Sequence, residues 1–304
     1  MTGAMAHGRT GLSRTTLATL ALLAMTAVWG STFVLIKDLL DRVPTLDFLA
    51  VRFLIAGIVM VLIAPRALAR LSPAARRQSL VLGLLYGVAQ ILQTTGLAHT
   101  AASVSGFVTG LYVVATPLLA AVILRTRIGG LTWAAVGLAT VGLGVLTLDG
   151  LSLGYGEAIT LVAAVLYGLH IVALGAWSTP GDALGMSIAQ VLVIALVCLV
   201  ATAPDGVVLP TRTSDWLSVL YMALVAGALA LVAQTWAQAH LAPTRAAIVM
   251  SMEPVFAATF AVGLGGESVT WRLLAGGAMV LVAMLVVEAG PRRSIEGEVQ
   301  HLAV

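Results

Sequence analysis

The chain has 304 residues, of which 60% are hydrophobic and only 10% are charged, and its formal net charge is +3. Soluble domains carry about 25% charged residues, so this composition excludes a water-soluble domain and requires lipid as the solvent. The single cysteine, Cys198, excludes a disulfide framework and a cysteine-rich metal site. The small net charge lies mainly in loops, which indicates membrane topology rather than nucleic-acid binding.

Ten apolar segments are each long enough for a membrane-spanning helix, which needs about 20 residues. In chain order we expect these spans at 16–36, 45–64, 79–98, 102–124, 129–148, 156–176, 183–203, 215–238, 244–264 and 270–288. The sequence therefore predicts an all-α membrane protein with ten transmembrane helices. Short polar tails are expected at 1–15 and 289–304.

The distribution of Lys and Arg predicts that both termini are cytoplasmic, because basic residues gather in cytoplasmic loops. With this orientation the outer side carries only Lys37, Arg42, Arg212 and Arg272. The bias is strong in the first half of the chain and weak in the second. The inner side carries Arg9, Arg14, Arg66, Arg70, Arg76, Arg77, Arg125, Arg127, Arg245, Arg292 and Arg293.

A polar heptapeptide is nearly repeated: QTTGLAH begins at Gln93 and QTWAQAH begins at Gln234. Other pairs recur at offsets of 137 to 141 residues, which divides the membrane part into two five-helix repeats, 16–148 and 156–288. Because five is odd, the second repeat must be inverted, an arrangement typical of secondary transporters. The alternative is that duplication only built a stable bundle. The other pairs are Trp29-Gly30 with Tyr167-Gly168, Pro117 with Pro254, and Thr132-Trp133 with Thr270-Trp271.

Four stretches of the two repeats carry a family resemblance. They are AVWGSTFVLIK (27–37), PTLDFLAVRFLIAG (44–57), SGFVTGLYVVATPLLAAVIL (105–124) and SMEPVFAATFAVGLGGE (251–267). Their order and spacing resemble the EamA-type carriers of the drug/metabolite transporter superfamily over nearly the whole membrane part. The resemblance implies a ten-helix, two-repeat carrier of the bacterial inner membrane. Many such carriers export amino acids or other small metabolites, and the resemblance names no substrate.

Polar residues at helical spacing predict a central cavity, because polar side chains inside a membrane face protein or water. We expect the first, third, fourth, sixth, eighth and ninth spans to surround this cavity, the second and seventh to flank it, and the fifth and tenth to lie outside. The alternative is that these groups only bond neighbouring helices. The polar positions are Tyr86, Gln90, Gln93 and Thr94; Ser105, Thr109, Tyr112 and Thr116; Tyr167 and His170; Ser187 and Gln190; and Gln234 and Gln238.

Two ionisable residues, Glu253 and Arg52, lie within predicted spans. A charge at mid-bilayer costs about 2.5–3.5 kcal/mol, so neither should face lipid. Pro254 frees the carbonyl of Met250 one turn earlier, and Pro117 has the same effect in its own helix. Glu253 beside such a carbonyl is a candidate for binding a cation or a proton. The alternative is that Glu253 pairs with Arg52 or a polar neighbour and only holds the halves together; Arg52 suits a structural anchor equally well.

Trp29, Gly30 and Ser31, in the first span, form the stretch most similar to the family. Glycine there permits either substrate approach or simple helix packing. The full set of predicted substrate-binding residues is Trp29, Gly30, Ser31, Tyr86, Gln90, Gln93, Thr109, Tyr112, Tyr167, His170, Gln234, Gln238 and Glu253, with Arg52, Pro117 and Pro254 as structural or coupling residues.

The sequence carries no P-loop, dinucleotide fingerprint or zinc motif, so we expect no cofactor and no enzyme activity. We expect a secondary transporter that exports small metabolites, amino acids or related amphipathic compounds first, by alternating access. Its partners would be the metabolite and the lipid bilayer, without nucleic acid. Protons are a candidate coupling ion because of Glu253 and His170. The alternative is a non-transporting membrane assembly or sensor protein of the same fold, for which the short tails leave little room.

Overall fold

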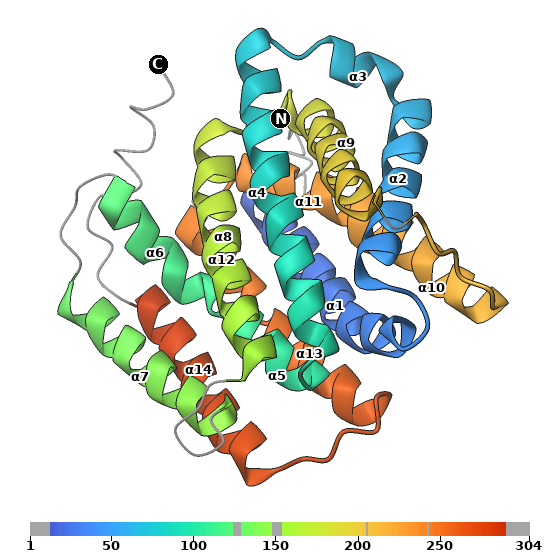
Figure 1. Cartoon of the computed structure of the whole chain (residues 1–304). Helices are drawn as coiled ribbons and strands as arrows, with labels where there is room; N and C mark the ends of the chain where they lie inside the picture. Colours follow the sequence, from blue (N-terminus) through green and yellow to red (C-terminus); the bar gives the residue numbers. More distant parts are fainter. Residues whose placement is uncertain (1–12, 124–128, 148–153, 205, 242, 290–304) are drawn as a thin grey trace, which may run out of the picture.

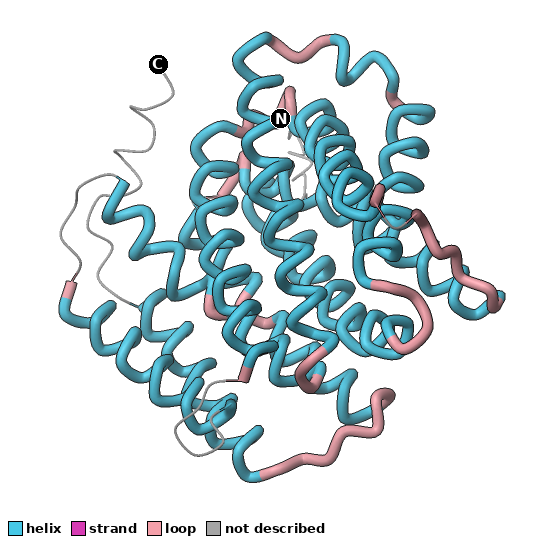
Figure 2. The backbone as a smooth tube through the Cα atoms, viewed as in Figure 1, coloured by secondary structure: helices cyan, strands magenta, loops and turns pink. Residues whose placement is uncertain are grey.

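A computed structural model describes residues 13–123, 129–147, 154–204, 206–241 and 243–289, and this part of the chain is helical without strands (Figures 1 and 2). The predicted tails, and the loop residues Arg125 and Arg127, lie almost wholly outside the described residues. The helices are α1 (Arg14–Leu40), α2 (Thr45–Ile63), α3 (Pro65–Ala69), α4 (Pro73–Ala98), α5 (Ala102–Gly110), α6 (Tyr112–Ile123), α7 (Gly130–Thr147), α8 (Tyr155–Trp177), α9 (Ala183–Thr202), α10 (Thr213–Ala223), the π-helical segment η1 (Leu224–Leu229), α11 (Ala230–Gln238), α12 (Pro243–Met250), α13 (Glu253–Gly263) and α14 (Trp271–Ala289).

Seven helical stretches in the described part of the chain are long and apolar enough to cross a membrane, counting α5–α6 and α10–α11 as one stretch each. Shorter apolar helices occur at Trp133–Leu146, Glu253–Gly263 and Trp271–Val286, within the remaining three predicted spans. Large apolar side chains such as Leu62 and Ile63 are mostly exposed. An apolar exterior of this kind suits lipid, where helices satisfy their own backbone hydrogen bonds.

Three of the predicted spans are interrupted rather than continuous. The span expected at 102–124 is interrupted at Leu111, between α5 and α6, and the span expected at 215–238 contains η1. The helix expected at 244–264 ends at Met250 and restarts at Glu253, so it is broken just before Pro254. Pro254 stands in the first turn of α13, where the missing N–H costs nothing because first-turn donors have no helical partner.

Helices from the two ends of the chain pack closely against each other. α4 lies between α8 and α9, α1 packs against α11 and α13, α5 packs against α13, and α7 pairs with α14 at one edge of the bundle (Figure 1). Glycines allow the closest contacts: a Cβ on Gly106 would stand 2.5 Å from Cβ of Ala257, and a Cβ on Gly83 would stand 2.6 Å from Cβ of Val193. Glycine at these positions therefore lets the paired helices approach closely.

A Gly106→Ala substitution is expected to destabilise the protein by about 1–3 kcal/mol, because the added methyl group overlaps Ala257 and forces α5 and α13 apart. The measurement is the midpoint of thermal unfolding in detergent. Gly137→Ala is the matched control, since a Cβ on Gly137 of α7 meets nothing within 4 Å. Equal midpoints for the two variants would contradict this account of the α5–α13 contact.

Charged side chains bind helix-end groups at one end of the bundle. Lys37 Nζ donates to the carbonyls of Leu97 and Ala98, at 3.0 and 3.1 Å, at the end of α4. The Glu267 carboxylate accepts from the backbone N–H of Ala102 at 2.7 Å and from the Ser103 hydroxyl at the start of α5. These side chains satisfy helix-end groups that a membrane environment would otherwise leave without partners.

An ion pair adds to the same end of the bundle. Arg42 Nη2 lies 2.8 Å from Asp215 Oδ1 and also contacts Asp38. The hydrogen bonds to Asp38 and then Asp215 raise the pKa of the Arg42 guanidinium further above its ordinary value. The Arg42 side chain therefore stays positively charged throughout the physiological pH range.

Candidate functional site

A cavity of about 50 Å³, lined by both polar and apolar side chains, lies among helices from both halves of the chain. This volume holds a few water molecules, since one water needs about 10–15 Å³. The seventh, fifth and tenth spans (α9, α7 and α14) contribute no lining residue, as expected of spans that flank the cavity or lie outside it, whereas the second span, α2, contributes Arg52. The lining residues are Trp29, Thr32, Phe33, Ile36, Arg52, Tyr86, Gln90, Gln93, Thr94, Leu97, Thr109, Tyr112, Tyr167, His170, Ile171, Gln234, Met250 and Glu253.

Most of the predicted site residues line this one cavity. The structure brings together Trp29, Tyr86, Gln90, Gln93, Thr109, Tyr112, Tyr167, His170, Gln234 and Glu253, and adds Arg52. Both glutamines that open the repeated heptapeptide are among them. The histidines that close it are not: His99 packs edge-on against Tyr155, and His240 Nδ1 lies 2.8 Å from the Trp236 carbonyl oxygen.

Amide and phenol groups form a continuous hydrogen-bond chain along one wall. Gln90 Nε2 donates to the Tyr167 hydroxyl at 2.6 Å, and that hydroxyl donates to Gln93 Oε1 at 2.8 Å. Gln93 Nε2 then donates to Thr109 Oγ1 at 3.2 Å. Tyr86 packs edge-on against both Tyr167 and His170. This series of hydrogen bonds fixes the orientation of each amide, so this wall is a preorganised polar surface.

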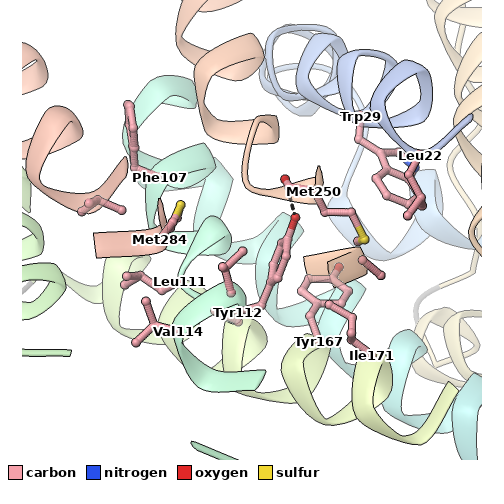
Figure 3. Packing of buried hydrophobic residues seen from close by; sticks show 14 of the residues in the cluster. Leu22, Trp29, Phe107, Leu111, Tyr112, Val114, Tyr167, Ile171, Met250 and Met284 are labelled. Carbon is pink, nitrogen blue, oxygen red and sulfur yellow. Dashed lines mark hydrogen bonds between the residues drawn. The ribbon is translucent and has the colours of Figure 1, made fainter. Parts of the chain in front are cut away.

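Glu253 lines the cavity at the start of α13, just after the break between α12 and α13. The Tyr112 hydroxyl lies 2.8 Å from the Met250 carbonyl and 3.0 Å from Glu253 Oε2, and Figure 3 shows the Tyr112–Met250 contact beside Tyr167. The Met250 carbonyl is the one that Pro254 was predicted to free, and the Tyr112 hydroxyl is its partner. Glu253 is 6% exposed and has no ion pair among the described residues.

Arg52 enters the cavity from α2 and is 3% exposed. Its Nε donates to the Met222 carbonyl at 3.0 Å, and its Nη1 stands 3.5 Å from Gln90 Oε1. The guanidinium also lies over the rings of Phe53 and Phe48, at 4.9 and 5.9 Å. The predicted alternative of an Arg52–Glu253 ion pair is absent among the described side chains, where no such pair comes within 4 Å.

The π-helical segment η1 shapes the part of the cavity near Arg52 and Trp29. A π-helical turn shifts the helical hydrogen bonds by one residue and leaves carbonyls available, a feature often found at functional sites. Trp29 Nε1 donates to the Ala226 carbonyl at 2.9 Å, and Arg52 binds the Met222 carbonyl one turn earlier. No sequence pattern marked this segment.

Two buried acceptors on the cavity wall have no hydrogen-bond partner in the described structure. They are Gln234 Oε1 and His170 Nδ1. His170 Nε2 is held by Gln190 Oε1 at 2.9 Å, which places Gln190 of α9 behind the wall. Buried polar atoms normally have partners, so these two atoms are candidates for contact with a bound solute.

Three predicted substrate-binding residues are placed elsewhere. A Cβ on Gly30 would stand 2.5 Å from Cβ of Phe256, so Gly30 serves helix packing. The Ser31 hydroxyl is bonded to Val28 and Tyr221, and Gln238 Nε2 donates to the Ile171 carbonyl. Pro117 lies inside α6, and Pro254 packs against Gly110.

Several lining residues are absent from the predicted set. Thr32, Phe33 and Ile36 follow Trp29 at steps of three, four and seven residues, so they share its face of α1. That spacing could have indicated them. Leu97 and Ile171 add to the apolar part of the lining, and Thr94, one of the polar positions of the expected cavity, also lines it. In the described residues, no group of three His, Cys, Asp or Glu side chains is arranged to hold a metal ion.

Comparison with known proteins identifies the family of this chain. The sequence matches the EamA-like transporter family twice, over residues 16–148 and 154–288. An "Uncharacterized transporter" of Archaeoglobus fulgidus is 28% identical over 277 residues, covering 88% of this chain and 84% of the relative. The "Uncharacterized inner membrane transporter YedA" of Escherichia coli K12 is 26% identical over 282 residues, covering 88% and 89%.

A solved crystal structure shares the fold, with a TM-score of 0.66 and 19% sequence identity over 91% of this chain and 98% of that one. The family match extends over both parts of the chain, and the described helices are apolar enough to cross a membrane. This multi-pass membrane protein is a transporter and belongs to the EamA-like transporter family.

Proposed function

We propose that the protein is a secondary transporter that moves small organic metabolites, amino acids or related amphipathic compounds, by alternating access. The cavity carries this proposal, because polar and ionisable side chains from both repeats line it inside a bundle with an apolar exterior. Its lining combines amide, phenol and ionisable groups with Trp29, Phe33 and Ile36, which suits a solute with a polar head and an apolar part.

Ten transmembrane helices arranged as two inverted repeats, 16–148 and 156–288, account for the packing. With the spans numbered in chain order, exchanging the two repeats turns each contact into another contact that is also present. The first span lies against the ninth, and the equivalent pair, the sixth and the fourth, also lies together. The third lies against the sixth, and the equivalent pair, the eighth and the first, does so too. The second and seventh, fourth and ninth, and fifth and tenth spans pair with their own counterparts. This pattern supports a pseudo-two-fold axis through the cavity.

The geometry at Glu253 supports proton coupling. Tyr112 has one hydroxyl proton and two oxygen neighbours, the Met250 carbonyl and the Glu253 carboxyl group. Both contacts are satisfied at once when the carboxyl group is protonated, since Glu253 then donates to Tyr112 while Tyr112 donates to Met250. Deprotonation leaves a buried carboxylate that an incoming cationic group or proton would stabilise.

Export across a bacterial inner membrane, with both termini cytoplasmic, is the direction and location we propose. Export rests on the family resemblance, and the location on the printed name of the Escherichia coli relative. With this orientation the polar contacts of Lys37, Glu267 and Arg42 close the outer end of the bundle. The cavity would then open first toward the cytoplasm, which suits loading of a solute for export.

Purified protein in proteoliposomes is expected to accumulate a few compounds from a mixed pool of amino acids and polar metabolites, read by mass spectrometry with and without a pH gradient. Protein-free liposomes are the control. Accumulation that depends on the protein would support a carrier and identify its solute class. Folded protein that moves nothing under any gradient would contradict the proposal.

A further inference from the structure

Arg52 is a buried cation without a counter-ion in the described part of the chain. A guanidinium has five N–H donors. One binds the Met222 carbonyl at 3.0 Å, and a second reaches Gln90 Oε1 only at 3.5 Å, the limit for a hydrogen bond. No described carboxylate lies within 4 Å of Arg52, and its hydrogen bonds to described residues come from Nε and Nη1, not from Nη2. The side chain nevertheless lines the cavity.

The surroundings of Arg52 do not compensate its charge. Contact with the faces of Phe53 and Phe48 contributes about 0.5–2 kcal/mol, whereas an unpaired buried charge costs several kcal/mol. The one acidic residue of α2, Asp47, accepts from Thr202 and from the Val208 N–H at 3.0 Å. An anion bound in the cavity would supply the missing charge, and the planar guanidinium is suited to a carboxylate.

We propose that Arg52, with Gln90 beside it, binds the anionic group of the transported solute, and that this group is a carboxylate. The inference rests on the proposed transport function and narrows its substrate class. Gln90 is fixed with its Oε1 toward Arg52, because its Nε2 donates to Tyr167. The 3.5 Å contact between Arg52 and Gln90 is loose enough for a carboxylate oxygen to replace it.

Lining residues of the second repeat supply acceptors for an ammonium group. Gln234 Oε1 has no partner, and Glu253 and the Met250 carbonyl share one phenol proton from Tyr112. Donors therefore come from Arg52 in the first repeat, and acceptors come from Gln234, Met250 and Glu253 in the second. A zwitterion placed between them satisfies both sides. The transported class is accordingly amino acids with a free carboxylate, to the exclusion of amines that lack one.

The test compares solutes that differ only in the carboxylate. Proteoliposomes are loaded with each common L-amino acid, and for every one that is transported, with the matching decarboxylated amine and carboxamide. Wild-type protein is expected to move the amino acid about 10 to 100 times faster than either analogue, the value of one hydrogen-bonded charge contact. The ratio of rates within one preparation is independent of the amount of folded protein.

Three variants assign the selectivity to Arg52. Arg52→Gln should reduce the ratio of the amino-acid rate to the analogue rate to within about threefold of one. Arg52→Lys should keep part of the preference for the amino acid, because the charge remains. Gln90→Glu places a carboxylate beside Arg52 and should reverse the preference toward the amine, without removing the bond from Arg52 to Met222. The Gln90→Glu variant therefore tests the proposal even where the Arg52→Gln protein does not fold.

The outcomes separate this inference from the proposed function. Wild-type protein that moves amino acids and their amines equally well would overturn the carboxylate site and leave the carrier function standing. An unchanged preference for amino acids over amines in both the Arg52→Gln and the Gln90→Glu variants would also overturn the carboxylate site and leave the carrier function standing. Folded protein that moves none of these solutes would overturn both proposals.

Discussion

A Glu253→Gln variant is expected to exchange solute across the membrane while losing its response to a pH gradient. Coupling to one proton lets a gradient of one pH unit support about tenfold accumulation, since one unit corresponds to 1.36 kcal/mol. Glutamine donates to the Tyr112 oxygen as a protonated Glu253 would, so the local hydrogen bonds survive while the titratable group is lost. The ratio of internal to external solute concentration should therefore fall to about one, while counterflow of solute is retained. Both are measured in proteoliposomes with an imposed pH gradient.

Glu157→Gln is the matched control for this substitution. Glu157 lies in the first turn of α8, outside the cavity lining, and accepts from Thr100 Oγ1 at 2.6 Å, a bond that a glutamine oxygen preserves. This variant should keep its gradient response. A Glu253→Gln protein that still accumulates solute tenfold under the gradient would refute coupling through Glu253.

A cysteine at position 94 is expected to react with charged thiol reagents added from either side of the membrane. Thr94 lines the cavity from α4 and is 1% exposed, so a reagent reaches it only when the cavity opens. The background is Cys198→Ala, because the native thiol is the chain's single cysteine and is buried. Labelling from both sides, slowed by a transported solute, is the result that alternating access requires.

Three further single-cysteine variants calibrate that experiment. Val88→Cys lies on the same helix with 42% exposure toward the apolar exterior and should resist charged reagents from both sides. Gly181→Cys, in the loop between α8 and α9, should react only from the cytoplasmic side, and Ser268→Cys, between α13 and α14, only from the outer side. Labelling of Gly181→Cys and Ser268→Cys from the same side would overturn the proposed topology. Labelling of Thr94→Cys from one side only would contradict alternating access.

The cavity residues that sequence reasoning identified are those whose polarity conflicts with a lipid environment. Gln90 and Gln93 are three residues apart on one helical face, and Gln234 recurs at the equivalent position of the repeated heptapeptide. All three line the cavity. Gln238 has the same polarity and helical spacing, yet it bonds the Ile171 carbonyl instead. Spacing gives the face of a helix and leaves open which neighbour stands opposite.

Glycine illustrates the same limit. Gly30 stood in the stretch most similar to the family and suited either substrate approach or packing. The position of Phe256, more than 200 residues later in the chain, decides for packing. The π-helical segment η1 has no local pattern that predicts it. Trp29 binds the Ala226 carbonyl within it and Arg52 binds the Met222 carbonyl just before it, and both side chains come from other helices.

An all-helical membrane protein with an internal repeat can be predicted without coordinates, because the length and apolarity of each segment and the recurrence of polar residues are local properties of the chain. Two facts could not be predicted in this way: Glu253 shares a phenol proton with Met250, and Arg52 has no described carboxylate within 4 Å. Both facts depend on distances between helices far apart in the chain. Helical periodicity fixes the direction of a side chain and does not fix those distances.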